Sequence, residues 1–143
     1  MSVVGLVPLR AGGSRVGLVG GLDKERALLG GYPLMAYTIR AAIDSGVFTD
    51  VVAVTASQPH ADLAEKYGAT SVRRPDYTVE DRSPDIEWVH WFFGGEEKYD
   101  AFAILRVTSP FRSAATIRAA WNKFRTTPGA HSLRSVRRVS EHP

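Results

Sequence analysis

Apolar residues follow two patterns along the chain. Short, nearly continuous aliphatic runs are typical of strands covered on both faces of a sheet, and they predict strands at residues 2–7, 50–55, 69–72 and 100–107. Apolar residues spaced three or four apart predict helices at residues 33–46, 57–67, 84–93 and 113–125. Pro8 is expected to end the first strand, and residues 130–139 alternate as a half-exposed strand would. In the third helix the residues expected to face inward are Ile86, Trp88, Val89 and Phe92.

The alternation of strands with helices predicts an α/β fold. We expect three layers, with a mostly parallel sheet and helices on both faces, in a Rossmann-like single domain of residues 1–143. In such a sheet the loops after the carboxyl ends of the strands share one edge, and ligands bind in the crevice that they form. All four of these loops carry polar or basic side chains: residues 10–24, 55–57, 73–83 and 106–112.

The composition of the chain indicates its cellular compartment and the class of ligand that it binds. The chain contains no cysteine, which excludes disulfides and thiolate metal sites and indicates a reducing, cytoplasmic setting. No apolar stretch approaches the roughly 20 residues of a membrane span, so we expect no membrane partner. Residues 101–140 carry basic but no acidic side chains. A nucleic-acid face would explain this run, but the basic residues do not alternate with aromatic ones as a stacking platform requires, so we favour an anionic small molecule.

A long glycine-rich, basic loop separates the first strand from the first helix. Its glycines permit backbone angles at which successive N–H groups turn toward one anion, and Arg10, Arg15 and Lys24 add countercharge. The spacing matches neither a P-loop nor a dinucleotide fingerprint. The loop therefore predicts a phosphate site of another kind. Among the four histidines no pair has metal-ligand spacing, and we expect His60 and His90 to be ordinary surface or interface residues.

Five segments, in this order and spacing, carry a family resemblance. They are residues 8–15 (PLRAGGSR), 29–39 (LGGYPLMAYTI) with Lys24, 54–57 (VTAS) with 64–69 (AEKYGA), 73–75 (RRP) with Asp81, and 108–112 (TSPFR). Together they resemble the acylneuraminate cytidylyltransferases, also called CMP-sialic acid synthetases. The resemblance implies a nucleotide-diphospho-sugar transferase fold and transfer of CMP from CTP to a sialic-acid-like sugar acid, with release of pyrophosphate.

The resemblance also implies roles for particular residues. Arg15 and Lys24 would be catalytic, because nucleotidyl transfer depends on positioning and on neutralising charge on the phosphates. The acceptor sugar would lie near Arg106, Thr108 and Ser109. The nucleotide would be held by Arg10, Gly12, Gly13, Ser14, Arg15, Lys24, Arg74, Asp81 and Ser83.

The implied partners are CTP, a sugar acid and a second copy of the chain in a homodimer, without nucleic acid or membrane. The implied cofactor is Mg²⁺, but the usual carboxylate ligands of the family have no counterpart in this sequence, so no residue is assigned to a metal. The family continues past the position of Pro143 with these ligands and a dimer-forming extension. We therefore expect a domain that lacks its C-terminal part.

The sequence departs from the family pattern at Arg15, Glu25, Ala56 and Arg106, where the family has Lys, Asn, Asp and Gln. Arg106 offers a bidentate clamp for a carboxylate or phosphate. Glu25 would repel a triphosphate unless it pairs with Arg26 or Arg15. Two functions stay open: a cytidylyltransferase, or a non-catalytic or truncated nucleotide-binding domain of the same fold.

Overall fold

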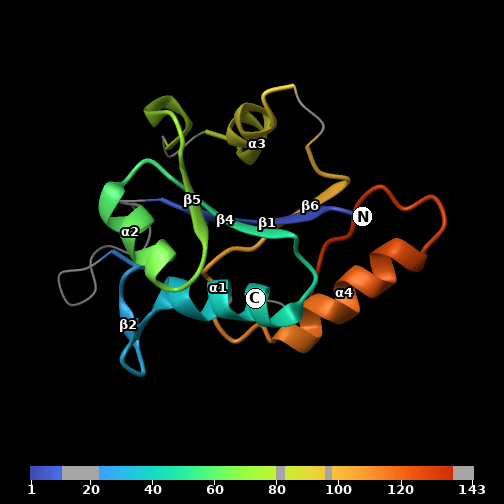
Figure 1. Cartoon of the computed structure of the whole chain (residues 1–143), viewed down its shortest axis with the longest axis horizontal. Helices are drawn as coiled ribbons and strands as arrows, with labels where there is room; N and C mark the ends of the chain where they lie inside the picture. Colours follow the sequence, from blue (N-terminus) through green and yellow to red (C-terminus); the bar gives the residue numbers. More distant parts are fainter. Residues whose placement is uncertain (11–22, 80–82, 96–97, 137–143) are drawn as a thin grey trace, which may run out of the picture.

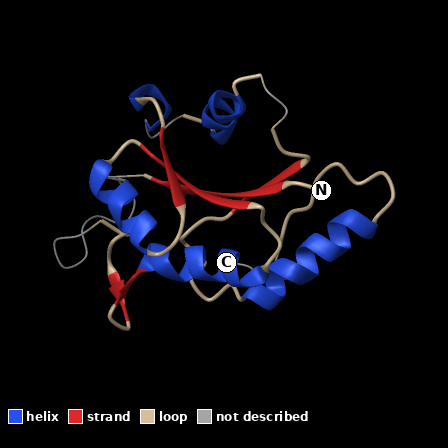
Figure 2. Ribbon diagram, viewed as in Figure 1, coloured by secondary structure: helices blue, strands red, loops and turns tan. Residues whose placement is uncertain are grey.

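The computed structural model describes residues 1–10, 23–79, 83–95 and 98–136. Its elements in chain order are β1 (Val3–Leu9), β2 (Leu28–Leu29), β3 (Tyr32–Pro33), α1 (Leu34–Ser45), β4 (Asp50–Thr55), α2 (Gln58–Lys66), β5 (Thr70–Arg73), the 3-10 helix η1 (Asp76–Val79), α3 (Asp85–Phe93), β6 (Ala101–Ile104) and α4 (Ala114–Thr126). The larger sheet has the strand order β5-β4-β1-β6, and all its neighbouring strands are parallel. Figure 1 shows α3 on one face of this sheet and α1 and α4 on the other. Figure 2 shows the same three layers, which confirm the predicted α/β architecture.

The middle strand β1 runs through Pro8, so the prediction that Pro8 ends it is wrong. β1 pairs with β4 as far as Leu9. On its other side the register with β6 ends at Leu6 opposite Ile104, and Leu105 donates its N–H to the Leu6 carbonyl at 2.8 Å. The next bond on that side would need an N–H from Pro8, which proline lacks. Pro8 therefore ends the pairing with β6, which is three residues shorter at this end than predicted.

Side chains alternate across β1 and divide the interior into two cores. Val7 and Leu9 belong to the core that contains Ile39 of α1. Leu6 points to the opposite face and packs in the core that contains Trp88 of α3. The sheet is thus covered on both faces, as its nearly continuous apolar strands predict.

The helix ends lie close to where the sequence predicts them. α1 ends at Ser45, and the following Gly46 has a φ of 65°, in the left-handed region that favours glycine. α4 begins after Ser113, whose Oγ accepts a hydrogen bond from the N–H of Thr116 at 3.1 Å.

One predicted inward residue of α3 is wrong. Trp88 and Val89 are buried and Phe92 is partly buried, but Ile86 is 56% exposed. Helical residues turn by about 100° each, so Ile86 points away from the side of the helix that Trp88 occupies.

A short hairpin before α1 is absent from the predicted elements. β2 and β3 pair antiparallel around Gly30 and Gly31, whose φ angles are 59° and 87°. Two consecutive positive φ angles define a tight turn that glycine accommodates. The hairpin exposes two large apolar side chains, Leu28 and Tyr32.

The strand predicted at residues 130–139 is wrong over its described part, since residues 130–136 form no strand and residues 131–136 are exposed. An alternating pattern gives a strand only beside a partner, and no strand of the larger sheet pairs with this segment. Of the helices in the described ranges, none has the length and apolar character to cross a bilayer.

Candidate functional site

Arginines follow three strands of the parallel sheet. Arg10 comes directly after β1, Arg74 directly after β5, and Arg106 shortly after β6. Since parallel strands end at one edge, their guanidinium groups gather at the carboxyl edge, where ligands of such folds bind. The structure thus brings together three of the residues that the sequence predicts for a ligand site.

Arg74 is deeply buried, with 3% of its surface exposed. Its Nη2 donates a hydrogen bond to the Thr78 carbonyl at 2.7 Å, and its guanidinium carbon lies 5.9 Å from the centre of the Trp88 ring. Burial lowers the pKa of Arg74, and the nearby charge of Arg10 lowers it further, while Asp85 opposes both effects. Within the part of the chain that the structure describes, the buried Nε of Arg74 has no hydrogen-bond partner. A cation with an unused donor is suited to an anionic oxygen.

Asp85 places a negative charge among these arginines. Its carboxylate forms an ion pair with Arg106, whose side chain is 55% exposed. The other carboxylate oxygen accepts a hydrogen bond from Trp88 Nε1 at 3.0 Å. Because Asp85 is the first residue of α3, this pair connects the chain after β6 to that helix.

The turn after β6 holds the other residues predicted for the acceptor. Thr108 and Ser109 are exposed there, and the Ser109 carbonyl accepts the backbone N–H of Arg112 at 3.2 Å. The predicted set omits Arg112. Burial lowers its pKa, and its buried Nη1 has no hydrogen-bond partner in the described ranges. The only sequence signal for it is its place at the end of the TSPFR segment.

Two further predicted nucleotide-binding residues are described. Lys24 is partly buried, and its Nζ lies 3.8 Å from Glu25 Oε1. Ser83 donates its hydroxyl to the Tyr77 carbonyl at 2.9 Å, which connects the segment before α3 to η1. The predicted residues that lie outside the described ranges are Gly12, Gly13, Ser14, Arg15 and Asp81.

A buried ionisable group beside Lys24 is missing from the sequence predictions. Asp23, Glu25 and His60 are 6%, 2% and 1% exposed, and one potential ligand atom of each lies within 4.8 Å of the others. His60 Nε2 is 3.0 Å from Asp23 Oδ1, and its Nδ1 is 2.7 Å from Ser57 Oγ. The prediction of a surface or interface histidine at position 60 is therefore wrong. The available signal was weak: Ser57 and His60 lie one helical turn apart.

The surroundings shift the pKa values of the two carboxyl groups in opposite directions. Burial alone would raise the pKa of Asp23, but the charge of His60 and the hydrogen bonds from Arg26 outweigh it and lower that pKa. Burial raises the pKa of Glu25, and the hydrogen bond from its own backbone N–H and the charge of Lys24 offset this only in part. Arg26 Nε lies 3.0 Å from Asp23 Oδ2, so Arg26 pairs with Asp23 rather than with Glu25.

The chain matches the cytidylyltransferase family over residues 4–139. It belongs to this family. The cytidylyltransferase chain is 32% identical over 139 residues to an N-acylneuraminate cytidylyltransferase of Escherichia coli, and the match covers 97% of this chain and 32% of that protein. It is 33% identical over 151 residues to a CMP-N,N'-diacetyllegionaminic acid synthase of Legionella pneumophila, covering 100% of this chain and 61% of that protein. The chain therefore spans less than two thirds of the length of these relatives.

Solved structures share the fold of this cytidylyltransferase chain. A CMP:2-keto-3-deoxy-manno-octonic acid synthetase complexed with CTP matches with a TM-score of 0.73 at 16% identity, covering 90% of this chain and 49% of that one. A cytidylyltransferase from Leptospira borgpetersenii matches with a TM-score of 0.67 at 18% identity, covering 90% and 51%. At these identities the likeness establishes the fold alone.

The buried carboxylate group does not fit Mg²⁺, the ion that membership of the cytidylyltransferases implies. Mg²⁺ prefers oxygen ligands in octahedral geometry and usually keeps several waters. The group of Asp23, Glu25 and His60 is buried and includes an imidazole. We therefore assign no described residue to Mg²⁺.

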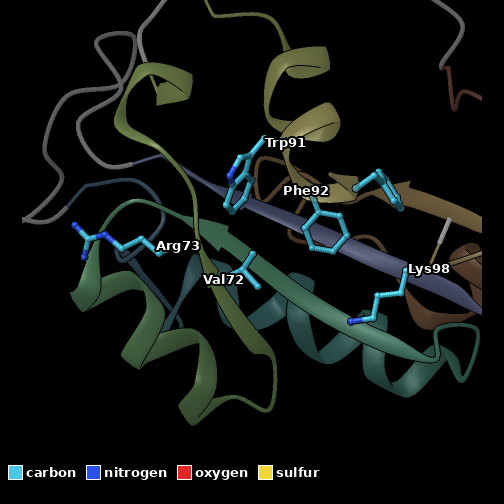
Figure 3. A pocket seen from close by; sticks show the side chains of 6 residues that line it. Val72, Arg73, Trp91, Phe92 and Lys98 are labelled. Atoms are coloured by element: carbon cyan, nitrogen blue, oxygen red, sulfur yellow. The ribbon is translucent and has the colours of Figure 1, made fainter. Parts of the chain in front are cut away.

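A pocket of about 460 Å³ lies between α3 and the β5 edge of the cytidylyltransferase sheet. Figure 3 shows the rings of Trp91 and Phe92 on α3 near Val72 of β5. None of the predicted site residues in the described ranges lines this pocket, and its aromatic wall does not suit a triphosphate. Its lining residues are Val72, Arg73, Trp91, Phe92, Phe93 and Lys98.

Proposed function

We propose that this protein transfers CMP from CTP to a hydroxyl of a sugar acid, so that the acceptor oxygen bonds to the α-phosphorus and pyrophosphate leaves. One observation carries the proposal: a chain of the cytidylyltransferase family gathers arginines from three strand ends at the carboxyl edge of its sheet. The names of two relatives support a sugar-acid acceptor, since they refer to N-acylneuraminate and to N,N'-diacetyllegionaminic acid.

The residue roles follow from charge and position. Arg10, Arg74 and Lys24 would bind the nucleotide, because cations near the phosphates neutralise the charge that spreads over their oxygens during transfer. Lys24 and Arg15 would act at the reacting phosphates, and Arg106, with Thr108 and Ser109, would hold the acceptor. The same proposal assigns to the nucleotide Gly12, Gly13, Ser14, Asp81 and Ser83.

Separate calorimetric titrations of the chain with CTP and with ATP, the control nucleotide, test the binding step. CTP should bind more tightly than ATP, and Arg10→Gln should weaken CTP binding by about tenfold, since it removes one charge-assisted contact. Arg125→Gln is the matched control, because Arg125 is exposed near the end of α4 and bonds to Asn122. Equal binding of both nucleotides, or none of either, would contradict the proposal.

A second candidate is a nucleotide-binding domain that does not catalyse transfer. It is favoured by Glu25, because this buried carboxylate lies beside Lys24 and would repel a triphosphate. A screen of sugar acids for pyrophosphate release from CTP separates the two functions. Release that requires a sugar acid supports transfer, whereas CTP binding without release with any acceptor supports the second candidate.

The remaining parts of the proposal are Mg²⁺ as the ion that accompanies CTP, a homodimer and a cytoplasmic location. CTP binding should strengthen when Mg²⁺ is added.

The exposed apolar side chains of the β2–β3 hairpin, Leu28 and Tyr32, are compatible with contact to a second copy, which sedimentation analysis would detect. The absence of cysteine supports the cytoplasm, and imaging of the tagged protein would test it.

A further inference from the structure

The group formed by Asp23, Glu25 and His60 has no part in the proposed transfer. We propose that these three side chains bind one divalent transition-metal ion, with Zn²⁺ as the test case, separate from any Mg²⁺ that accompanies a nucleotide. One potential ligand atom of each residue lies within 4.8 Å of the others, and no member is more than 6% exposed. Carboxylate oxygen and imidazole nitrogen are both ordinary zinc ligands.

Glu25 gives an independent reason to place a cation here. Its Oε2 is buried and has no hydrogen-bond partner among the described residues. Lys24 Nζ is 3.8 Å from the other oxygen, beyond hydrogen-bond distance, and the Lys24 side chain is 28% exposed. A buried carboxylate oxygen without a hydrogen-bond partner is costly, and a second carboxylate beside it adds repulsion. A divalent ion between Asp23 and Glu25 would relieve both costs.

The spacing of two ligand atoms already suits a single ion. Asp23 Oδ1 and His60 Nε2 are 3.0 Å apart. Two ligands that each lie about 2.1 Å from zinc, at angles between 90° and 110°, are separated by about 3.0–3.4 Å. Without metal a hydrogen bond joins these two atoms, and the ion would take its place. The ligand atom of Glu25 lies within 4.8 Å of both and would move closer to complete a set of three ligands.

The outer contacts of the group resemble those of metal ligands. Ser57 Oγ is 2.7 Å from His60 Nδ1 and can accept its N–H, which leaves Nε2 free to coordinate. Arg26 Nε donates to the outer oxygen of Asp23 at 3.0 Å. Such second partners orient metal ligands and fix the tautomer of a coordinating histidine. Here they hold both side chains in place before an ion arrives.

The ligand set selects the class of ion. Imidazole with carboxylates suits Zn²⁺, Mn²⁺ or Fe²⁺, whereas Mg²⁺ and Ca²⁺ prefer oxygen alone. Asp23 and His60 are 37 positions apart in sequence, so a shared ion would connect the segment before the hairpin to α2. An ion that binds only the folded chain stabilises it by mass action.

Zinc titration of the EDTA-treated, dialysed chain against a chromophoric chelator tests the site. One ion should bind per chain, the ¹⁵N signal of His60 Nε2 should shift, and the unfolding temperature should rise. His60→Gln and Glu25→Gln should each weaken binding by about tenfold or more. The matched controls are His90→Gln and Glu87→Gln, because both residues are exposed on α3, and these variants should bind zinc like the parent chain.

Two results would overturn the proposal. One is the absence of saturable binding of a single ion to the parent chain. The other is binding that persists in a folded His60→Gln or Glu25→Gln variant, since zinc would then lie at another histidine. If His60→Gln fails to fold, the zinc affinity of Glu25→Gln and the ¹⁵N signal of His60 in the parent chain still test the proposal. No nucleotide is present, so this outcome is independent of the proposed transfer.

Discussion

At the scale of single residues, Glu25 makes stability depend on pH. Burial raises its pKa above the ordinary value of 4.5. A raised pKa means that the folded chain holds the proton more tightly than the unfolded chain, so this contribution to stability is complete below pH 4.5 and is lost as the pH rises through the folded pKa. Without metal, Glu25→Gln should therefore gain stability relative to the parent chain between pH 4.5 and 8, as measured by thermal unfolding in EDTA.

Glu87→Gln is the control for this pH series, because Glu87 is exposed in the first turn of α3. The stability of Glu87→Gln relative to the parent chain should stay nearly constant or fall slightly as the pH rises. The reason is that the substitution removes a favourable interaction of a carboxylate with the helix dipole. If the stability of Glu25→Gln relative to the parent chain stayed constant or fell as the pH rises, Lys24 would compensate the buried charge fully. With zinc added, the parent chain should become more stable than Glu25→Gln, since only the parent chain has all three proposed ligands.

At the scale of elements, the start of α4 depends on one side chain. Ser113 Oγ accepts the Thr116 N–H at 3.1 Å, and its hydroxyl lies 3.0 Å from Thr116 Oγ1. Ser113→Ala should lower the free energy of unfolding by about 1 kcal/mol, measured by urea denaturation, because it leaves a helix N–H without its partner. Ser113→Asp should keep the stability of the parent chain. Equal losses in both variants would show that the cap itself contributes nothing.

The elements that the sequence predicts well are those whose signals are local. Gly46 and Ser113 end and begin helices through their own backbone and side-chain geometry, and no distant contact is needed. Residues 130–136 fail because a strand needs a partner that the alternation cannot supply. The effect of Pro8 likewise depends on neighbouring strands. Its missing N–H matters on the β6 side of β1 and not on the β4 side.

At the scale of the whole molecule, topology explains which parts of the candidate site the sequence could predict. Arg10, Arg74 and Arg106 follow strands, and parallel strands end at one edge, so their gathering follows from the order of elements. The contact of His60 with Asp23 depends instead on how α2 is rotated against the segment before the hairpin. A single sequence holds little information about that rotation, so it does not predict this buried group.

The balance of charge at the carboxyl edge gives a last prediction. Asp85 pairs with Arg106 and its field reaches Arg74, so it reduces the positive potential offered to a triphosphate. Asp85→Asn keeps an acceptor for Trp88 Nε1 but removes the charge, and CTP affinity should rise by about three- to tenfold in calorimetry at low salt. Glu87→Gln removes a charge from the same helical turn, away from these ion pairs, and should leave CTP affinity unchanged. Weaker CTP binding by Asp85→Asn would mean that Asp85 positions the arginines for the nucleotide instead of competing with it.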